Sequence, residues 1–219
     1  MSKRKPVSVV EPRKEPKQER SRQTYQVILQ GAAKIIRRDG IKKFSTNKVA
    51  EESGVSIGSL YQYFPSKEAI IAALIDQIFE LEYSRLKELL SELSAEIGAR
   101  EVLKKILSHY YHIDHEALQF RKAMVDSVAM VDKTEEAMRF HKQMAELLVN
   151  YIRENFRCEP SEANHATTIF MIQYMLRTTA LSSVDPNLKN IDKEAMVDEI
   201  ANIFVKFLRV LPEDWTAKN

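Results

Sequence analysis

Hydroxyl, amide and ammonium side chains are concentrated in one stretch of the sequence, which runs from Ser45 to Lys67. Groups of this kind hydrogen-bond to phosphate oxygens and to the edges of nucleotide bases. They can act together only if short structural elements hold them on one surface. The chemistry that these residue types allow is therefore contact with a nucleic acid, provided that the surrounding sequence builds such elements.

Local signals in this stretch predict two short helices. Ser45 or Thr46 can cap the first of them, and Gly54 breaks it. Ser56 can cap the next helix, which Pro65 ends. Two short helices joined by a tight turn that contains glycine form a helix-turn-helix, whose second helix enters the major groove of DNA.

The rest of the chain is also predicted to be helical, because apolar residues recur at spacings of three and four and no strand pattern competes. The expected helices lie near residues 21–40, 67–93, 99–117, 119–131, 134–156, 161–183 and 193–210. The predicted fold class is all-α with about nine helices, an N-terminal three-helix helix-turn-helix domain being followed by a larger helical domain. The expected segments are a flexible basic arm (1–20), the helix-turn-helix domain (21–67) and the helical body (68–219).

Charge is distributed unevenly along the chain. Residues 1–67 carry a net charge of +9, from 15 Lys and Arg against 6 Asp and Glu, whereas the other 152 residues carry −7. A basic segment followed by an acidic body is typical of a nucleic-acid-binding domain joined to a domain with another task. A solvated charged face is the alternative. For the arm, contact with a DNA groove and a tail without a partner both stay open.

Composition disfavours several other classes of protein. No run of about 18 apolar residues occurs, and the basic, proline-containing N-terminus is unlike a secretion signal, so we expect a cytoplasmic protein without a membrane partner. Cys158 is the only cysteine, which rules out an intrachain disulfide and a multi-cysteine metal site. No nucleophile paired with a base and no glycine-rich phosphate loop is found, so we predict neither an enzyme nor a bound cofactor.

Three histidines, His109, His112 and His115, lie three residues apart on one predicted helix. Steps of three residues spread their rings over about 120° around the helix axis, which suits a single metal ion poorly. We therefore expect protonatable pocket or surface histidines and no metal site.

The helix-turn-helix residues resemble those of the TetR family of transcription regulators over about residues 22–75. The matching positions are Ile28-Leu29, Ala32-Ala33, Gly40, Ser45-Thr46, Val49-Ala50, Gly54-Val55-Ser56, Gly58, Leu60-Tyr61, Tyr63-Phe64 and Ser66-Lys67. Two positions depart from the pattern: Phe44, where small or polar residues are common, and Gly31 inside the first helix, which costs about 1 kcal/mol relative to alanine. The resemblance implies a homodimer that binds a palindromic operator in double-stranded DNA.

The residues of this stretch fall into four groups by expected role. Apolar side chains such as Leu60 and Phe64 form the small core that sets the angle between the helices. Gly58 lets the backbone approach the duplex closely, with a packing role as the alternative. The residues expected to contact phosphates are Ser45 or Thr46, Tyr61, Tyr63 and Lys67. The residues expected at base edges, where similar proteins also make such contacts, are Asn47, Ser56, Ile57, Ser59 and Gln62.

The resemblance also implies that residues 68–219 provide dimerisation and an effector pocket, and that the last two long helices pair between subunits. The expected interface residues are Ile169, Gln173, Leu176, Ile200, Phe204 and Phe207. The pocket, for an apolar or aromatic small molecule, is expected to use Phe79, Tyr83, Tyr110, Phe120, Met124, Met171, Tyr174 and Met175, with core packing as the alternative for each. Together these features predict a ligand-responsive repressor that an effector releases from its operator. A transcription activator of the same fold and an effector-free DNA-organising protein are the alternatives.

Two substitutions distinguish residues that contact phosphates from residues that contact base edges. We expect Lys67→Ala to weaken binding to every DNA sequence and to flatten the salt dependence, because a phosphate contact is lost. We expect Asn47→Ala to alter base preference at one operator position. Titration of specific and random duplexes checks both, and equal losses on the two duplexes for both variants would contradict the division.

Overall fold

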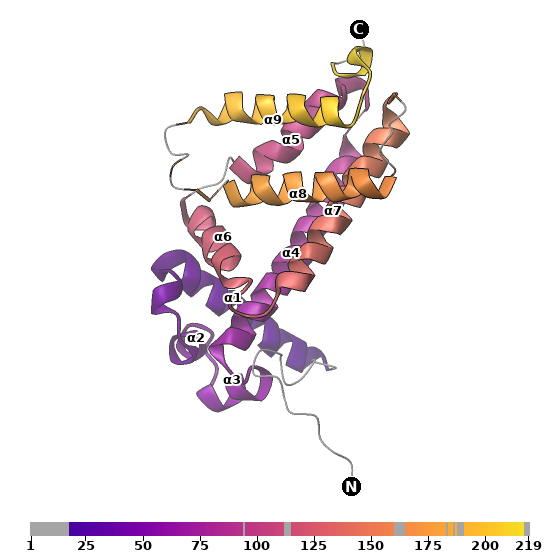
Figure 1. Ribbon diagram of the computed structural model, residues 1–219. Coiled ribbons are helices and arrows are strands. Elements are labelled where there is room, and N and C mark those ends of the chain that lie inside the picture. The colour runs from indigo at the N-terminus through magenta and orange to yellow at the C-terminus, as the bar shows by residue number, and fades with distance from the viewer. Residues whose placement is uncertain are drawn as a thin grey trace. The chain divides into compact units, whose positions relative to one another are not determined.

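The computed structural model describes residues 18–93, 95–111, 115–159, 165–182, 184–185, 187 and 191–216. Its helices in chain order are α1 (Glu19–Asp39), η1 (Ile41–Lys43), α2 (Thr46–Glu52), α3 (Ile57–Tyr63), α4 (Lys67–Glu92), η2 (Ala95–Ile97), α5 (Ala99–Tyr111), α6 (His115–Ser127), α7 (Thr134–Asn155), α8 (His165–Ser182), α9 (Lys193–Phe207) and η4 (Pro212–Asp214) (Figure 1). Outside these helices the described residues contribute only an isolated antiparallel bridge between Cys158 and Val210. The predicted all-α fold class is confirmed. No described helix combines the length and apolar character that crossing a lipid bilayer requires.

The chain divides into two compact units. The first comprises Met1–Phe79 and Asp114–Ala137, and the second comprises Glu80–Ile113 and Met138–Asn219. The first unit extends past Lys67 because Ala69 to Ile75 of α4, together with Phe120 and Met124 of α6, are buried in the same core as α1, α2 and α3. The first half of α4 and the whole of α6 therefore support the helix-turn-helix.

Helix caps and glycines define the helix-turn-helix as the sequence predicts. The C-cap of α1 is Gly40, which has a φ of 77°. Ser45 caps α2 by accepting a hydrogen bond from Lys48 N at 3.4 Å, and Ser56 caps α3 by accepting one from Ser59 N at 3.0 Å. Gly54, between the two helices, has a φ of +65°, a conformation that side-chain-bearing residues rarely adopt. The turn therefore needs glycine at this position.

Gly31 allows α1 and α2 to pack closely. A Cβ atom at Gly31 would overlap with Ser53 Oγ and lie 3.3 Å from the Cβ and backbone N of Ser53. Gly31 is buried, and its place in the middle of α1 follows from this contact and not from helix propensity. The other departure, Phe44, is 6% exposed and belongs to the core of the first unit.

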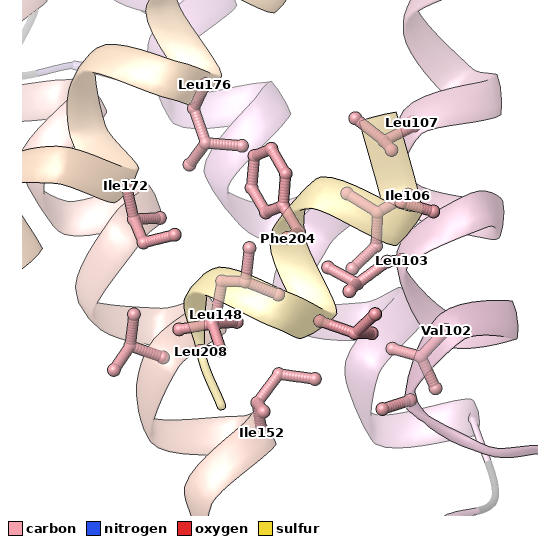
Figure 2. Packing of buried hydrophobic residues seen from close by; sticks show 14 of the residues in the cluster. Val102, Leu103, Ile106, Leu107, Leu148, Ile152, Ile172, Leu176, Phe204 and Leu208 are labelled. Atoms are coloured by element: carbon pink, nitrogen blue, oxygen red, sulfur yellow. The ribbon is translucent and has the colours of Figure 1, made fainter. Parts of the chain in front are cut away.

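The second unit is built around α9, which packs against α5. Phe204 and Leu208 lie among apolar residues of α5, α7 and α8, as Figure 2 shows. Polar contacts hold the same helices: Arg100 of α5 donates to Asn202 Oδ1 at 2.8 Å, and Lys104 Nζ lies 2.8 Å from Asp198 Oδ1. The second unit thus has a core of its own.

Most predicted helix bounds agree with the structure within a few residues, and the boundary between α5 and α6 differs most. The helix expected over 99–117 ends at Tyr111, and the one expected over 119–131 begins at His115 and ends at Ser127. After Ser127 the chain turns, with Lys133 N donating to Val128 O at 2.8 Å. Asp132 adopts a φ of 54° there, which a continuing helix excludes.

Replacing Gly31 by alanine is expected to destabilise the protein by about 1–3 kcal/mol, although alanine favours helices, because the new methyl group overlaps with Ser53. Urea unfolding measures the change. Ser53→Ala is the control: its buried hydroxyl has no hydrogen-bond partner, so its loss is expected to be neutral or stabilising and to relieve part of the Gly31→Ala effect. A Gly31→Ala protein more stable than the parent would contradict this explanation.

Candidate nucleic-acid interface

Helix α3 buries one face and exposes the other. Leu60 and Phe64 are fully buried in the core of the first unit. The exposed residues are Ser56, Ile57, Gly58, Tyr61 and Gln62, with 39% exposure for Ile57 and 40% for Tyr61. Apolar side chains of this size on an exposed helix face, next to polar ones, provide both van der Waals and hydrogen-bonding contacts to a partner.

A hydrogen bond joins the start of α2 to the exposed face of α3. Thr46 Oγ1 and the Tyr61 hydroxyl are 3.1 Å apart, so two of the predicted phosphate-binding groups lie side by side. Asn47, the next residue, is exposed. The side chain of Ser45 caps α2, which leaves Thr46 as the outer hydroxyl of the pair.

Ser56 and Ser59 form a small hydroxyl pair at the start of α3. Their Oγ atoms are 2.8 Å apart, and Ser56 Oγ also accepts from Ser59 N at 3.0 Å. The Ser56 hydroxyl oxygen thus already accepts one hydrogen bond in capping α3. Each of the two hydroxyl groups can still form a further hydrogen bond, for example with a base edge.

The hydroxyl of Tyr63 is held from α1. Ser21 Oγ and Tyr63 OH are 3.1 Å apart, and the ring of Tyr25 meets that of Tyr63 edge-on at 6.3 Å. Tyr63 is half-buried. Ser21 is a residue that sequence reasoning missed, because 42 positions separate it from its partner and no local pattern links them.

Gly58 has free space where a side chain would stand. A Cβ atom there would meet only Ser56 Oγ, at 3.9 Å, which is an ordinary van der Waals distance. Its φ lies outside the range that favours glycine. Among the described residues, none gives Gly58 a packing contact that would require glycine, and its close approach to a duplex stays a prediction.

Lys67 is the first residue of α4 and its side chain is 55% exposed. Its ammonium lies 3.9 Å from the carboxylate of Glu68, a long and exposed pairing of little energetic weight. The group stays available to an anion.

Two acidic side chains neutralise part of the basic charge of α1. Glu52 forms ion pairs with Lys34 and Arg38, and hydrogen bonding to Lys34, followed by the charges of Lys34 and Arg38, lowers its pKa. Arg38 also donates to both oxygens of Asp39, at 3.2 and 3.1 Å. Arg37 instead lies over the ring of Phe120 of α6, 4.8 Å from its centroid.

The residues predicted for an effector pocket are distributed over the two units. Phe120 and Met124 belong to the core of the first unit, and Phe79 packs against it while half-buried. Tyr83 and Met175 pack against the core of the second. Met171 and Tyr174 are exposed, at 42% and 39%. The side chain of Tyr110 lies outside the described residues. The pocket stays a prediction.

The residues predicted for the dimer interface face inward within the protomer. Ile169, Gln173, Leu176 and Phe204 are less than 9% exposed, and Ile200 and Phe207 pack against the same core while half-buried. The exposed apolar residues of these helices are different ones: Phe170, Met171, Tyr174, Leu181 and Ile203. The two helices expected at the interface are present. Their exposed apolar residues lie one or more positions away in sequence from the residues that we predicted for the interface.

Of the three histidines singled out from the sequence, His112 lies outside the described residues, and so do the side chains of His109 and His115. Among the residues that are described, no three His, Cys, Asp or Glu side chains are grouped so as to hold a metal ion.

Two known proteins are similar to part of the chain. The nucleoid occlusion factor SlmA of Aliivibrio fischeri (strain MJ11) is 35% identical over 81 residues, which cover 36% of this chain and 41% of that protein. The fatty acid metabolism regulator protein of Bacillus subtilis (strain 168) is 26% identical over 92 residues, 42% of this chain and 46% of that protein. The matches thus span less than half of either relative.

Solved structures extend the likeness to the whole fold. The fatty acid degradation regulator FadR from Bacillus halodurans matches with a TM-score of 0.63 over 90% of this chain and 100% of that chain, at 19% identity. A sequence identity of this size supports similarity of fold only. The family described as "Bacterial regulatory proteins, tetR family" matches residues 28–74, from α1 through the helix-turn-helix into α4. This N-terminal region is therefore similar to that of the TetR family of bacterial regulatory proteins.

Proposed function

We propose that the protein is a transcription regulator that binds an operator in double-stranded DNA through α3 of two identical subunits. The observation that carries this proposal is the exposed face of α3, where base-binding residue types stand beside a glycine with free space and two tyrosines held by hydroxyl groups of neighbouring helices. A helix of this kind fits the major groove. Ser56, Ile57, Ser59 and Gln62 of α3, with Asn47 of α2, contact base edges.

Phosphate contacts position α3 in this proposal. The Thr46–Tyr61 pair and the Ser21–Tyr63 pair each keep a tyrosine hydroxyl in place at one edge of the helix-turn-helix. A hydroxyl that is already oriented loses less conformational entropy when it binds a phosphate oxygen. Lys67 adds a positive charge at the start of α4.

Regulation by a small apolar or aromatic effector that releases a repressor from DNA is the finer part of the proposal. The name of the Bacillus subtilis relative, a regulator of fatty acid metabolism, agrees with an apolar ligand. The name of SlmA, a nucleoid occlusion factor, favours the second candidate, a DNA-organising protein without an effector. Binding to a few operators near regulated genes distinguishes the first candidate from the second.

Dimerisation in this proposal uses the exposed apolar side chains of α8 and α9. Phe170, Tyr174 and Leu181 lie within about 40° of one another around α8, as spacings of four and seven residues dictate. The rings of Phe170 and Tyr174 are 4.7 Å apart, and Ile203 of α9 is 53% exposed. An exposed aromatic and aliphatic surface of this kind is typical of subunit interfaces.

Selection of bound fragments from the source genome tests the function. We expect the protein to enrich a palindrome whose half-sites are about one helical turn, or a multiple of it, apart. Gly58→Ala is the matched variant: alanine has room in the free protein and favours the helix, but its methyl group stands where the duplex approaches. It is expected to keep its thermal stability and to lose at least about tenfold in affinity, or about 1.4 kcal/mol. Failure to enrich any palindrome would overturn the proposal of an operator-specific regulator.

Charge on the exposed face of α8 is expected to prevent dimerisation. We expect Phe170→Glu combined with Ile203→Glu to sediment at the mass of one chain while the parent sediments at twice that mass, because buried carboxylates without partners oppose association. Met130→Glu is the control, since Met130 is 61% exposed and lies on neither helix. A dimer that survives the double substitution would place the interface elsewhere.

A further inference from the structure

Three lysines stand together before and within the first turn of α2. Lys42 and Lys43 belong to the short helix η1, and Lys43 is two residues from Ser45, the N-cap of α2. Lys48 lies in the first turn of α2. All three side chains are exposed.

These lysines differ from Lys34 and Arg38 in having no acidic partner. Lys34 and Arg38 are engaged by Glu52 and Asp39. No ion pair within the part of the chain that the structure describes involves Lys42, Lys43 or Lys48. The segment 34–52 holds six basic and three acidic residues, so its net charge is positive, and these three lysines contribute to it without an ion pair.

Two of the three charges act on one carboxylate, and all three lysines flank the start of α2. Asp39 has a lowered pKa, first because Arg38 donates hydrogen bonds to it and then through the charges of Arg38, Lys43 and Lys48. Lys43 and Lys48 therefore lie near the same carboxylate. Thr46, between them in sequence, is hydrogen-bonded to Tyr61 of α3, which places this end of α2 beside the exposed face of α3.

We infer that Lys42, Lys43 and Lys48 form a second phosphate-binding surface, on the α2 side of the helix-turn-helix and distinct from Lys67 at the start of α4. This inference rests on the proposed function and deepens it. An unpaired ammonium binds a phosphate without first breaking an ion pair, whereas Lys34 and Arg38 would have to give up Glu52 and Asp39. Because every DNA sequence carries the same phosphates, these lysines strengthen binding to operator and random DNA alike.

The salt dependence of binding measures such contacts directly. The probe is a fluorescently labelled random-sequence duplex of about 30 base pairs, long enough to cover a site of two half-sites one helical turn apart. It is titrated with the full chain at several salt concentrations, and circular dichroism verifies the helical content of each variant. Replacing Lys42, Lys43 and Lys48 by alanine removes six lysines from the dimer. It is expected to reduce the slope of log K against log salt by up to about 5, since each phosphate contact contributes about 0.9.

Two further triple variants separate local contact from overall charge. Lys42→Arg, Lys43→Arg and Lys48→Arg together are expected to retain the parent slope, because the charges stay. Lys87→Ala, Lys105→Ala and Lys206→Ala together remove the same charge from exposed positions of the second unit and are expected to change the slope by less than about 1.

The outcomes distinguish failure of the inference from failure of the proposed function. If the parent protein binds the duplex but the two alanine triple variants have equal slopes, the second phosphate-binding surface is refuted while DNA binding stands. If the parent protein does not bind the duplex at all, the proposed function and the inference both fail. A Lys34→Ala variant with a loss as large as that of the triple variant would show that ion pairing does not separate the two groups of basic residues.

Discussion

The orientation of α3 depends on one small apolar core shared by α1, α2, α3, the first half of α4 and α6. Val49, Leu60 and Phe64 are fully buried in it and make the two short helices of the motif inseparable from their support. A seven-residue helix is not stable alone in water, so its shape and direction come from this packing. The close approach at Gly31 sets how deep α2 lies against α1. Each polar side chain on the exposed face is placed by that arrangement.

Ion pairs and hydrogen bonds also hold the helices of the first unit, in addition to the packing of its core. Glu52 holds two basic side chains of α1, which ties α1 to α2 through exposed ion pairs of small individual value. The tyrosine hydroxyls are fastened in a different way, by Ser21 and Thr46. The result is a surface on which some cations are committed to the fold and others are available to an anion. A domain that binds a polyanion needs both, because cations that are all free would repel one another in the folded state.

Local sequence signals are sufficient to predict the helix-turn-helix. They do not give the direction of each side chain, on which the other predicted contacts depend. Ser45, Ser56, Gly40 and Gly54 act at the helix ends where the pattern placed them, because capping and positive φ depend on neighbouring residues alone. The contacts of Ser21 and Gly31 depend on packing between distant segments, which periodicity does not encode. In α8 the apolar residues surround the helix almost completely, so spacing could not tell the buried Ile169 from the exposed Phe170. The inward position of the expected interface residues has this cause.

An effector can change DNA affinity only by the difference between its affinities for two arrangements of the protein. Two of the residues expected to line a pocket, Phe120 and Met124, belong to the core that orients α2 and α3, and a third, Phe79, packs against it. A ligand that displaced Phe120 would also disturb Arg37, whose guanidinium lies over that ring. Arg37 is in α1, one turn after Ala33 and next to the ion-paired Arg38. A ligand that bound at α6 would therefore disturb α1 directly through Arg37, and α1 supports the exposed face of α3.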